Sequence, residues 1–210
     1  MLSIRKGNTM RMLAAVAAMV MSQAAFAVTA TCGWEGSETV LALTGTGTPP
    51  MNVAIDTDPV HSGSQSLYLE DNSPTGTPEA YVAWIVGLED GDEVTASFWR
   101  YDTTPAASPS CRIWAHWNDD PTDLMSDDGS ASGETAYGPG TGWDQTGYTW
   151  TVADGHTGLV IEIRTYSNPG DAVWVDDLEV TSPSGTIIWT PDTYTPVQSS
   201  TWAGIKNLFR

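Results

Sequence analysis

Short apolar runs alternate with polar turns along most of this chain. The runs are six to ten residues long, are rich in Val, Ile, Leu, Trp and Tyr, and are separated by clusters of Gly, Pro, Asp, Asn and Ser. Helical periodicity is nearly absent, and this alternation of runs and turns is typical of strands. The pattern predicts strands at 38–43, 65–70, 79–87, 92–101, 111–117, 147–152, 157–166 and 172–180.

The spacing of these runs predicts an all-β fold, a two-sheet antiparallel β-sandwich. Within the run 92–101, Val94 and Phe98 share one face and Trp99 lies on the other, because side chains alternate along a strand. The next long runs also pair an apolar face with a face that mixes aromatic rings, Arg, Glu and His. That mixed face is too polar for a second core and too aromatic for an ordinary wetted surface. Segment 118–143, rich in Gly, Asp and Ser, is expected to be an extended surface loop.

The N-terminus has the pattern of a targeting segment. Three basic residues precede an apolar run at 12–21, and Ala25-Phe26-Ala27 has the small-x-small pattern of a cleavage site. The apolar run is too short for a membrane span. Residues 1–27 are therefore predicted to be a secretory signal peptide, so the mature protein is expected to be secreted, extracellular or at the cell surface.

Removing 27 of 210 residues leaves 183, enough for one domain with its own core. This domain is expected to span 28–183. Residues 184–210 are expected to be a linker and C-terminal tail, in which Trp202, Ile205 and Leu208/Phe209 fall at helical spacing. The tail is predicted to dock to the sandwich or to a secretion or surface-attachment partner.

Acidic residues dominate the charge. Removing the three N-terminal bases leaves five basic residues against 26 acidic ones, a formal net charge of −21. Such a surface repels nucleic acid and anionic membranes, and it favours divalent cations and neutral partners. Two cysteines, Cys32 and Cys111, allow one disulfide in an oxidising compartment, and the sequence leaves its formation open. Two cysteines and three scattered histidines make a zinc site an unfavoured reading.

Five motifs follow one another in an order that resembles a known family. They are Gly33-Trp34-Glu35, the turn 61–67 (HSGSQSL), the strand entry 86–99, the segment 143–152 and the closing strand 174–180 (WVDDLEV). The order is similar to carbohydrate-binding modules of the family 4/9 type, which are β-sandwich jelly rolls attached to secreted glycanases. The resemblance covers about Gly33 to Val180, and it implies a jelly-roll fold and a glycan ligand.

The closing strand contains two adjacent aspartates, Asp176 and Asp177, among apolar residues. Neighbouring strand side chains point to opposite faces, so the two carboxylates are expected to diverge, and one of them needs a buried partner. The family resemblance implies a structural calcium ion there, held by Glu35, Asp176 (or Asp177) and the turn from His61 to Gln65. Calcium readily mixes carboxylate and carbonyl ligands. The alternative is an exposed aspartate at a bulge, paired with Arg164 or capped by backbone amides.

The mixed face is the expected glycan site. Sugars present apolar faces rimmed by hydroxyl groups, so they suit flat aromatic rings beside side chains that form hydrogen bonds. The alternative is that several tryptophans cap the sandwich ends or that the long loop covers this face. The candidate ligand-binding residues are Trp99, Tyr101, Arg112, Trp114, His116, Glu162 and Arg164, with Trp84 and Trp143 from a neighbouring strand and loop.

Catalysis is not predicted. Glycanases need two carboxyl groups at a set separation, and the adjacent acids of the closing strand are expected to diverge. The sequence shows no nucleophile elbow, phosphate loop or histidine-rich metal triad. Two functions stay open: a secreted, calcium-stabilised glycan-binding protein, or a structural or adhesive cell-surface protein that self-assembles, with its tail as a sorting element.

Overall fold

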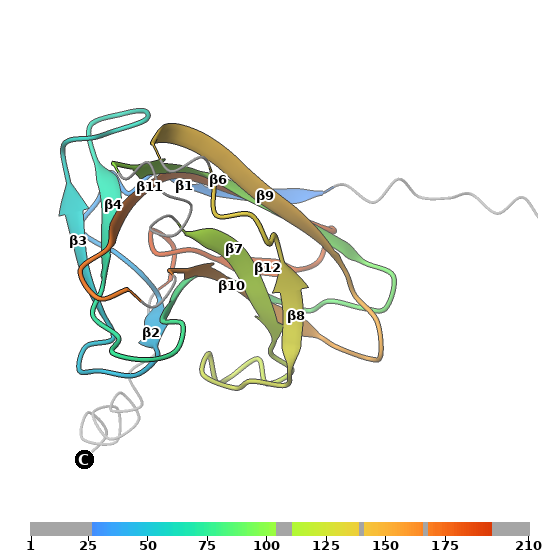
Figure 1. Ribbon diagram of the computed structural model, residues 1–210. Helices are drawn as coiled ribbons and strands as arrows, with labels where there is room; N and C mark the ends of the chain where they lie inside the picture. The colour runs from blue at the N-terminus through green and yellow to red at the C-terminus, as the bar shows by residue number, and fades with distance from the viewer. Residues whose placement is uncertain (1–26, 104–110, 139–140, 166–167, 195–210) are drawn as a thin grey trace, which may run out of the picture.

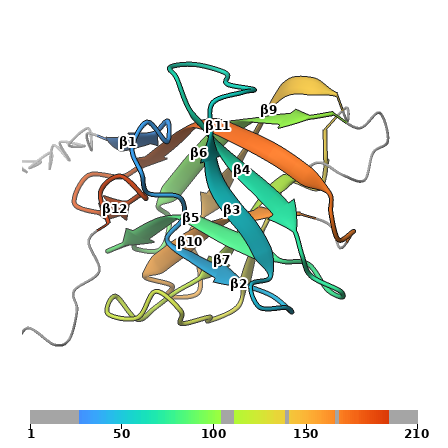
Figure 2. The same ribbon diagram turned by 90° about the vertical axis from the view of Figure 1, so that its left-hand side faces the viewer.

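The fold is an antiparallel β-sandwich (Figure 1). The structure is a computed structural model, and it describes residues 27–103, 111–138, 141–165 and 168–194. Within these ranges it has twelve strands and no helix, arranged as two antiparallel sheets that pack face to face (Figures 1 and 2). The predicted all-β, two-sheet architecture is confirmed.

Each sheet contains a path of five strands and one further strand. Sheet A has the order β3 (Met51–Asp56), β4 (Ser66–Asp71), β11 (Ala172–Ser182), β6 (Glu93–Asp102) and β9 (Gly142–Thr151), with β1 (Val28–Cys32) paired to β11. Sheet B has the order β12 (Ile187–Trp189), β5 (Glu79–Val86), β10 (Gly158–Arg164), β7 (Arg112–Trp117) and β8 (Ser130–Gly133), with β2 (Ala42–Thr44) paired to β5. The outer surfaces of the two sheets are called face A and face B below.

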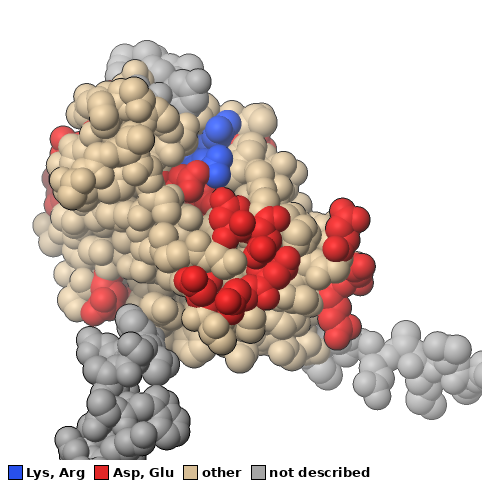
Figure 3. Space-filling model, turned by 90° about the horizontal axis from the view of Figure 1, so that it is seen from below, with Lys and Arg blue, Asp and Glu red and all other residues tan. Residues whose placement is uncertain are grey.

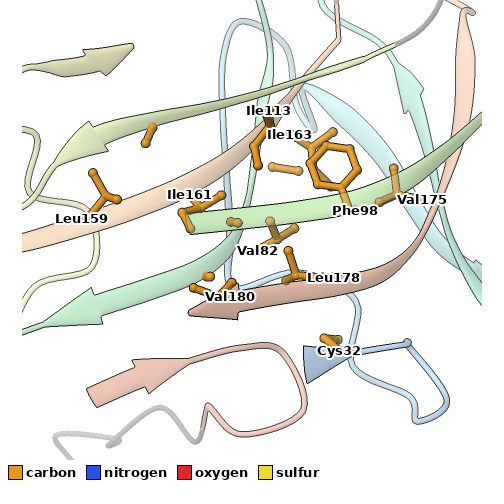
Figure 4. Close-up of a cluster of buried hydrophobic side chains, with 14 of the residues drawn as sticks. Cys32, Val82, Phe98, Ile113, Leu159, Ile161, Ile163, Val175, Leu178 and Val180 are labelled. Atoms are coloured by element: carbon orange, nitrogen blue, oxygen red, sulfur yellow. The ribbon is translucent and has the colours of Figure 1, made fainter. Parts of the chain in front are cut away.

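The core lies between the sheets. Phe98, Val175 and Leu178 from sheet A meet Ile161 and Ile163 from sheet B, and all five are fully buried (Figure 4). Burying a side chain of this size stabilises the fold by about 1.5–3 kcal/mol. The inward positions that alternation predicted along β6, β7 and β10 are confirmed.

All eight predicted runs contain strand residues, but four strands lie outside them. Three of these, β1, β3 and β8, contain few large β-forming side chains. Strand β8 (SASG) forms because Gly133 admits close backbone approach: a Cβ there would lie 2.3 Å from the Ile113 carbonyl oxygen. Part of the predicted 118–143 loop is therefore an edge strand.

The fourth strand outside the runs, β12, lies in the predicted tail. It pairs with β5 with Ile188 opposite Ile85, and both side chains belong to the core. The sandwich therefore extends beyond the expected boundary at residue 183, because the short apolar run supplies one more edge to sheet B. Residues 1–26 of the predicted signal peptide (1–27) and the predicted helical residues Trp202, Ile205 and Leu208/Phe209 lie outside the described residues. In the ranges that the structure describes, no helix is long and apolar enough to cross a membrane.

Both cysteines are buried free thiols, so the disulfide that the sequence left open is not formed. Burial raises the pKa of the Cys32 and Cys111 thiols to about 12. Neither thiol is therefore a reactive thiolate, and both pack as small apolar core residues.

Candidate functional site

A β-bulge decides where the two aspartates of β11 point. Asp176 lies opposite Trp99 of β6 while Glu179 lies opposite Ser97, so two residues of β11 face one residue of β6. Asp177 adopts φ 51°, a left-handed conformation that a bulge requires and that Asp tolerates. The expectation that the carboxylates diverge is therefore wrong, because the extra residue turns both toward the same loop.

That loop is the turn from His61 to Gln65, called the 61–65 turn here. Asp176 Oδ2 accepts the backbone N–H groups of His61 at 2.9 Å and Ser62 at 3.1 Å, and its Oδ1 accepts the N–H of Asp177 at 2.8 Å. Asp177 contacts His61 Nδ1 at 2.7 Å and accepts the Ser62 hydroxyl at 2.6 Å. Backbone N–H groups thus donate hydrogen bonds to Asp176, as expected for the alternative in which backbone amides cap the aspartate. Arg164, which the same alternative also named, lies in sheet B and forms its ion pairs with Glu79 and Glu162.

Asp176 is fully buried although it lies on the outer side of sheet A, because the turn folds over it. Burial raises the pKa of this carboxyl, while the hydrogen bonds from the turn oppose that rise. Burying the charged form of Asp176 therefore costs free energy, and the three backbone N–H donors offset part of this cost.

Glu35 holds the other end of the same turn. Its Oε1 accepts the N–H groups of Ser64 at 2.8 Å and Gln65 at 3.3 Å, and its Oε2 accepts the Ser64 hydroxyl at 2.6 Å. The Ser64 hydrogen bonds lower the pKa of Glu35. Gly63 has φ 70°, and a Cβ there would lie 1.9 Å from Glu35 Oε1, so only glycine fits. Glu35 and the pair Asp176 and Asp177, which are far apart in sequence, thus hold one turn through hydrogen bonds.

The predicted calcium ligands surround this turn, but their carboxylates do not converge. Among the described residues, no three His, Cys, Asp or Glu side chains form a group that could hold a metal ion. The oxygens that gather are backbone carbonyls: those of Trp34, Glu35 and Gly36 lie 2.9, 3.3 and 3.0 Å from one terminal atom of the Gln65 side-chain amide. With its NH₂ on that side, Gln65 donates to all three.

The predicted glycan face is divided between the two sides of the molecule. Three of its residues lie on face A and six on face B, and these faces point in opposite directions because the sheets pack through their inner surfaces (Figure 2). The alternation of side chains separates the inside of a strand from its outside but does not show which sheet the strand joins. The prediction that all nine residues share one face is therefore wrong. Face A carries Trp99, Tyr101 and Trp143, and face B carries Trp84, Arg112, Trp114, His116, Glu162 and Arg164.

Face B contains a chain of charged contacts. Glu162, fully buried, hydrogen-bonds His116 Nδ1 and accepts Arg164 Nε at 2.6 Å. Arg164 Nη2 also lies 2.6 Å from Glu79 Oε1, and Thr44 donates to the second oxygen of Glu79 at 2.8 Å. Burial and then the charge of Glu162 raise the pKa of Glu79. Sequence reasoning missed Glu79 because it opens a run that was otherwise apolar.

Aromatic and cationic groups stack beside this chain. The guanidinium of Arg112 lies 4.6 Å from the centre of the Trp114 ring and 5.0 Å from that of Tyr137, and Arg164 lies 5.0 Å from Trp114. Trp114 and both arginines are half-buried. In the part of the chain that the structure describes, Arg112 and Arg164 are the basic residues that are not fully buried. The view toward face B shows basic side chains beside a gathering of acidic ones (Figure 3).

The other end of face B is covered. Leu124, in the loop between β7 and β8, packs with Tyr81, Trp84 and Val160 as a second small core. The indole nitrogen of Trp84 is buried there, without a hydrogen-bond partner among the described residues. The loop between β7 and β8 therefore covers face B around Trp84, as the alternative drawn from the sequence expected. Trp84 is thus a core residue and not a surface residue.

On face A, Trp99 lies under the 61–65 turn. His61 stacks on its ring with a centroid distance of 4.0 Å and an interplanar angle of 15°, and Trp143 meets His61 edge-on at 5.2 Å. Tyr101 packs against Trp143 at 5.3 Å. His61 thus contacts residues of both predicted sites. It hydrogen-bonds Asp177 of the predicted metal site and stacks on Trp99 of the predicted glycan site.

No family model matches the chain, and no curated protein sequence matches it. Solved structures do share its fold. The tandem of family 22 carbohydrate-binding modules from Paenibacillus barcinonensis Xyn10C is 14% identical with a TM-score of 0.52, over 77% of this chain and 47% of that one. The enzymatically active domain of bacteriophage CBA120 tailspike protein 4 is 18% identical with a TM-score of 0.50, over 67% and 19%. The first xylan-binding module of the same Xyn10C is 15% identical with a TM-score of 0.49, over 73% and 92%.

Identities of this size show a shared fold and nothing more. The tandem consists of family 22 carbohydrate-binding modules, which supports the β-sandwich type of the resemblance but not family 4/9 in particular. This chain spans about half of the tandem and a fifth of the tailspike domain.

Proposed function

We propose that this protein is a non-catalytic carbohydrate-binding protein whose glycan site is the uncovered end of face B. The observation that carries the proposal is the half-buried Trp114 ring with Arg112 and Arg164 stacked against it. Glu162 and Glu79 hold Arg164 by its Nε and Nη2 atoms. An indole plane flanked by oriented guanidinium donors and a carboxylate acceptor suits the apolar face and hydroxyl rim of a sugar.

Charge narrows the ligand to neutral glycans. The two arginines sit among carboxylates, and the chain has 26 acidic against eight basic residues. Because like charges repel, acidic polysaccharides and nucleic acid are disfavoured partners. In the proposed site, Glu162 and His116 are positioning residues, since they are buried and reach the ligand only through Arg164 and the sheet.

The fold of the neighbours supports this proposal without deciding the ligand. Several are carbohydrate-binding modules, and one is described as xylan-binding, so xylan belongs among the first glycans to test. We also propose that the protein works outside the cytoplasm, on the strength of the signal-peptide pattern in residues 1–27.

Replacing Trp114 tests the site. Trp114→Ala removes the ring on which both guanidinium groups stack, and binding to neutral glycans measured by calorimetry is expected to weaken at least about tenfold. Met125→Ala is the matched control, because Met125 is half-exposed in the neighbouring loop and its loss should leave binding unchanged. Equal affinities of the Trp114→Ala variant and the wild type would remove face B from the binding site.

We further propose that calcium binds beside the 61–65 turn and stabilises the sandwich. The oxygens that suit it are the carbonyls of Trp34, Glu35 and Gly36, next to the Glu35 carboxylate. To join them as a ligand, the Gln65 amide turns its oxygen, in place of its NH₂ group, toward the ion. Bound calcium would supply positive charge and tie the chain start to the turn. The melting temperature is expected to rise in calcium and fall in EDTA, and Gln65→Met should abolish the difference. Identical melting in calcium and EDTA contradicts the proposal.

A further inference from the structure

Face A carries a straight row of four aromatic side chains. Tyr68, Trp174, Tyr101 and Trp143 lie directly opposite one another in register on β4, β11, β6 and β9. Their ring centroids are 5.3, 6.0 and 5.3 Å apart in that order, and each side chain is half-buried. Three steps between adjacent strands make the row roughly 14 Å long. We call these four residues the aromatic row.

The aromatic row is not part of the core. Its members alternate along their strands with the core residues Leu69, Val175 and Phe98, so their rings stand on the opposite, outer side of sheet A. Aromatic side chains in register do stabilise neighbouring strands. Four of them in one line across four strands also leave a continuous, partly exposed ring surface, which is uncommon outside binding sites.

Polar groups at one end of the row show what kind of ligand it suits. The Trp174 indole N–H donates to Asp56 Oδ2 at 2.9 Å, and the Tyr68 hydroxyl donates to Glu70 Oε2 at 3.0 Å. The hydrogen bond from Trp174 lowers the pKa of Asp56, which favours its charged, hydrogen-bond-accepting form. Asn52 adds an amide beside Glu70, with its Nδ2 3.3 Å from Glu70 Oε2.

This composition matches a neutral polysaccharide and disfavours the other partners. Ring surfaces suit the apolar faces of sugars, and fixed carboxylate and amide groups accept or donate to hydroxyls. Anionic chains would meet the charges of Asp56 and Glu70. A second copy of this protein would bring the same acidic side chains toward each other, which costs binding energy.

We propose that face A is a second glycan-binding surface, on which a neutral polysaccharide lies along the aromatic row and across the strands. This surface needs no contribution from face B. Because faces A and B point in opposite directions, a molecule that uses both joins two glycan chains; this consequence alone rests on the function proposed for face B.

The test compares one variant on each face. Tyr101→Ala/Trp143→Ala interrupts the aromatic row, Trp114→Ala removes the face B platform, and Met125→Ala is the control. Each is assayed by calorimetry with soluble xylan, mixed-linkage β-glucan and galactomannan, after its melting curve has confirmed folding. Should the double variant not fold, Trp143→Ala alone is used. We expect at least a tenfold loss of affinity at one site in the face A variant, with the face B site retained.

Light scattering of polysaccharide solutions measures the joining of chains. Wild-type protein is expected to raise the scattering of a dilute polysaccharide that binds it, and either face variant to abolish that rise. A folded face A variant that binds like the wild type overturns the inference and leaves face B intact. If only the face A variant loses affinity and Trp114→Ala binds like the wild type, the result supports glycan binding on face A and contradicts the site proposed on face B. Wild-type protein that binds none of the three glycans, or that forms a dimer broken by the face A variant, overturns the glycan assignment of face A.

Discussion

Removing the Asp176 carboxylate should destabilise the fold more than removing either of the other acids that contact the 61–65 turn, Glu35 and Asp177. Asp176→Ala leaves the N–H groups of His61, Ser62 and Asp177 without their acceptor. An unsatisfied buried donor costs about 1–3 kcal/mol, and these three N–H groups are only partly buried, so each is expected to lie at the lower end of that range. Relief from burying a charge offsets part of the loss. The expected net destabilisation is about 2–3 kcal/mol.

Urea unfolding followed by tryptophan fluorescence measures this effect. Asp176→Asn keeps one oxygen for the turn but turns an NH₂ group toward a backbone donor, so about 1–2 kcal/mol is expected. Glu179→Ala, on the same strand but exposed, is the control and should stay within about 0.5 kcal/mol of wild type. If Asp176→Ala were as stable as Glu179→Ala, the turn would not depend on the buried acid and the reasoning would fail.

Two further predictions concern the core thiols and the turn glycine. Cys32 and Cys111 should resist iodoacetamide at pH 8 in the folded protein and react fully in urea, as mass spectrometry would record. The pKa of each thiol in the folded protein lies above the unfolded value of 9.0. The thiols therefore contribute fully to the free energy of unfolding below pH 9, and this contribution is lost as the pH rises toward 12. Replacing both cysteines with Ala should reduce the fall in stability over that pH range. Gly63→Ala should lower the melting temperature far more than Gly76→Ala, since both have positive φ but a Cβ at Gly76 meets nothing within 4 Å. Equal melting of the two variants would contradict the steric argument.

Sequence alone was sufficient for the inside and outside of β6, β7 and β10, but not for the partition into two sheets. Trp99 and Trp114 both alternate with core residues, and nothing in that pattern shows that β6 joins sheet A while β7 joins sheet B. Sheet membership depends on long-range pairing, as between β6 and β11. Local pattern carries no information about such pairing.

The acidic pair shows the same limit at the scale of one residue. The resemblance grouped Glu35, the 61–65 turn and Asp176 around a calcium ion, and the structure joins Glu35 and Asp176 to that turn through hydrogen bonds. The bulge that turns Asp177 toward His61 was not predicted, because it requires a left-handed Asp that alternation does not reveal. Strand β8 was missed for a comparable reason, as its short SASG sequence pairs through backbone fit rather than side-chain preference.

The position of β11 constrains how the chain can fold. This strand comes late in the sequence yet sits in the middle of sheet A, where it pairs with β4, β6 and β1. Without residues 172–182, the pairs β3–β4 and β6–β9 have no strand to join them in sheet A. Assembly of this sheet therefore waits until residues 172–182 have been synthesised, and it proceeds slowly because its pairings span long stretches of sequence.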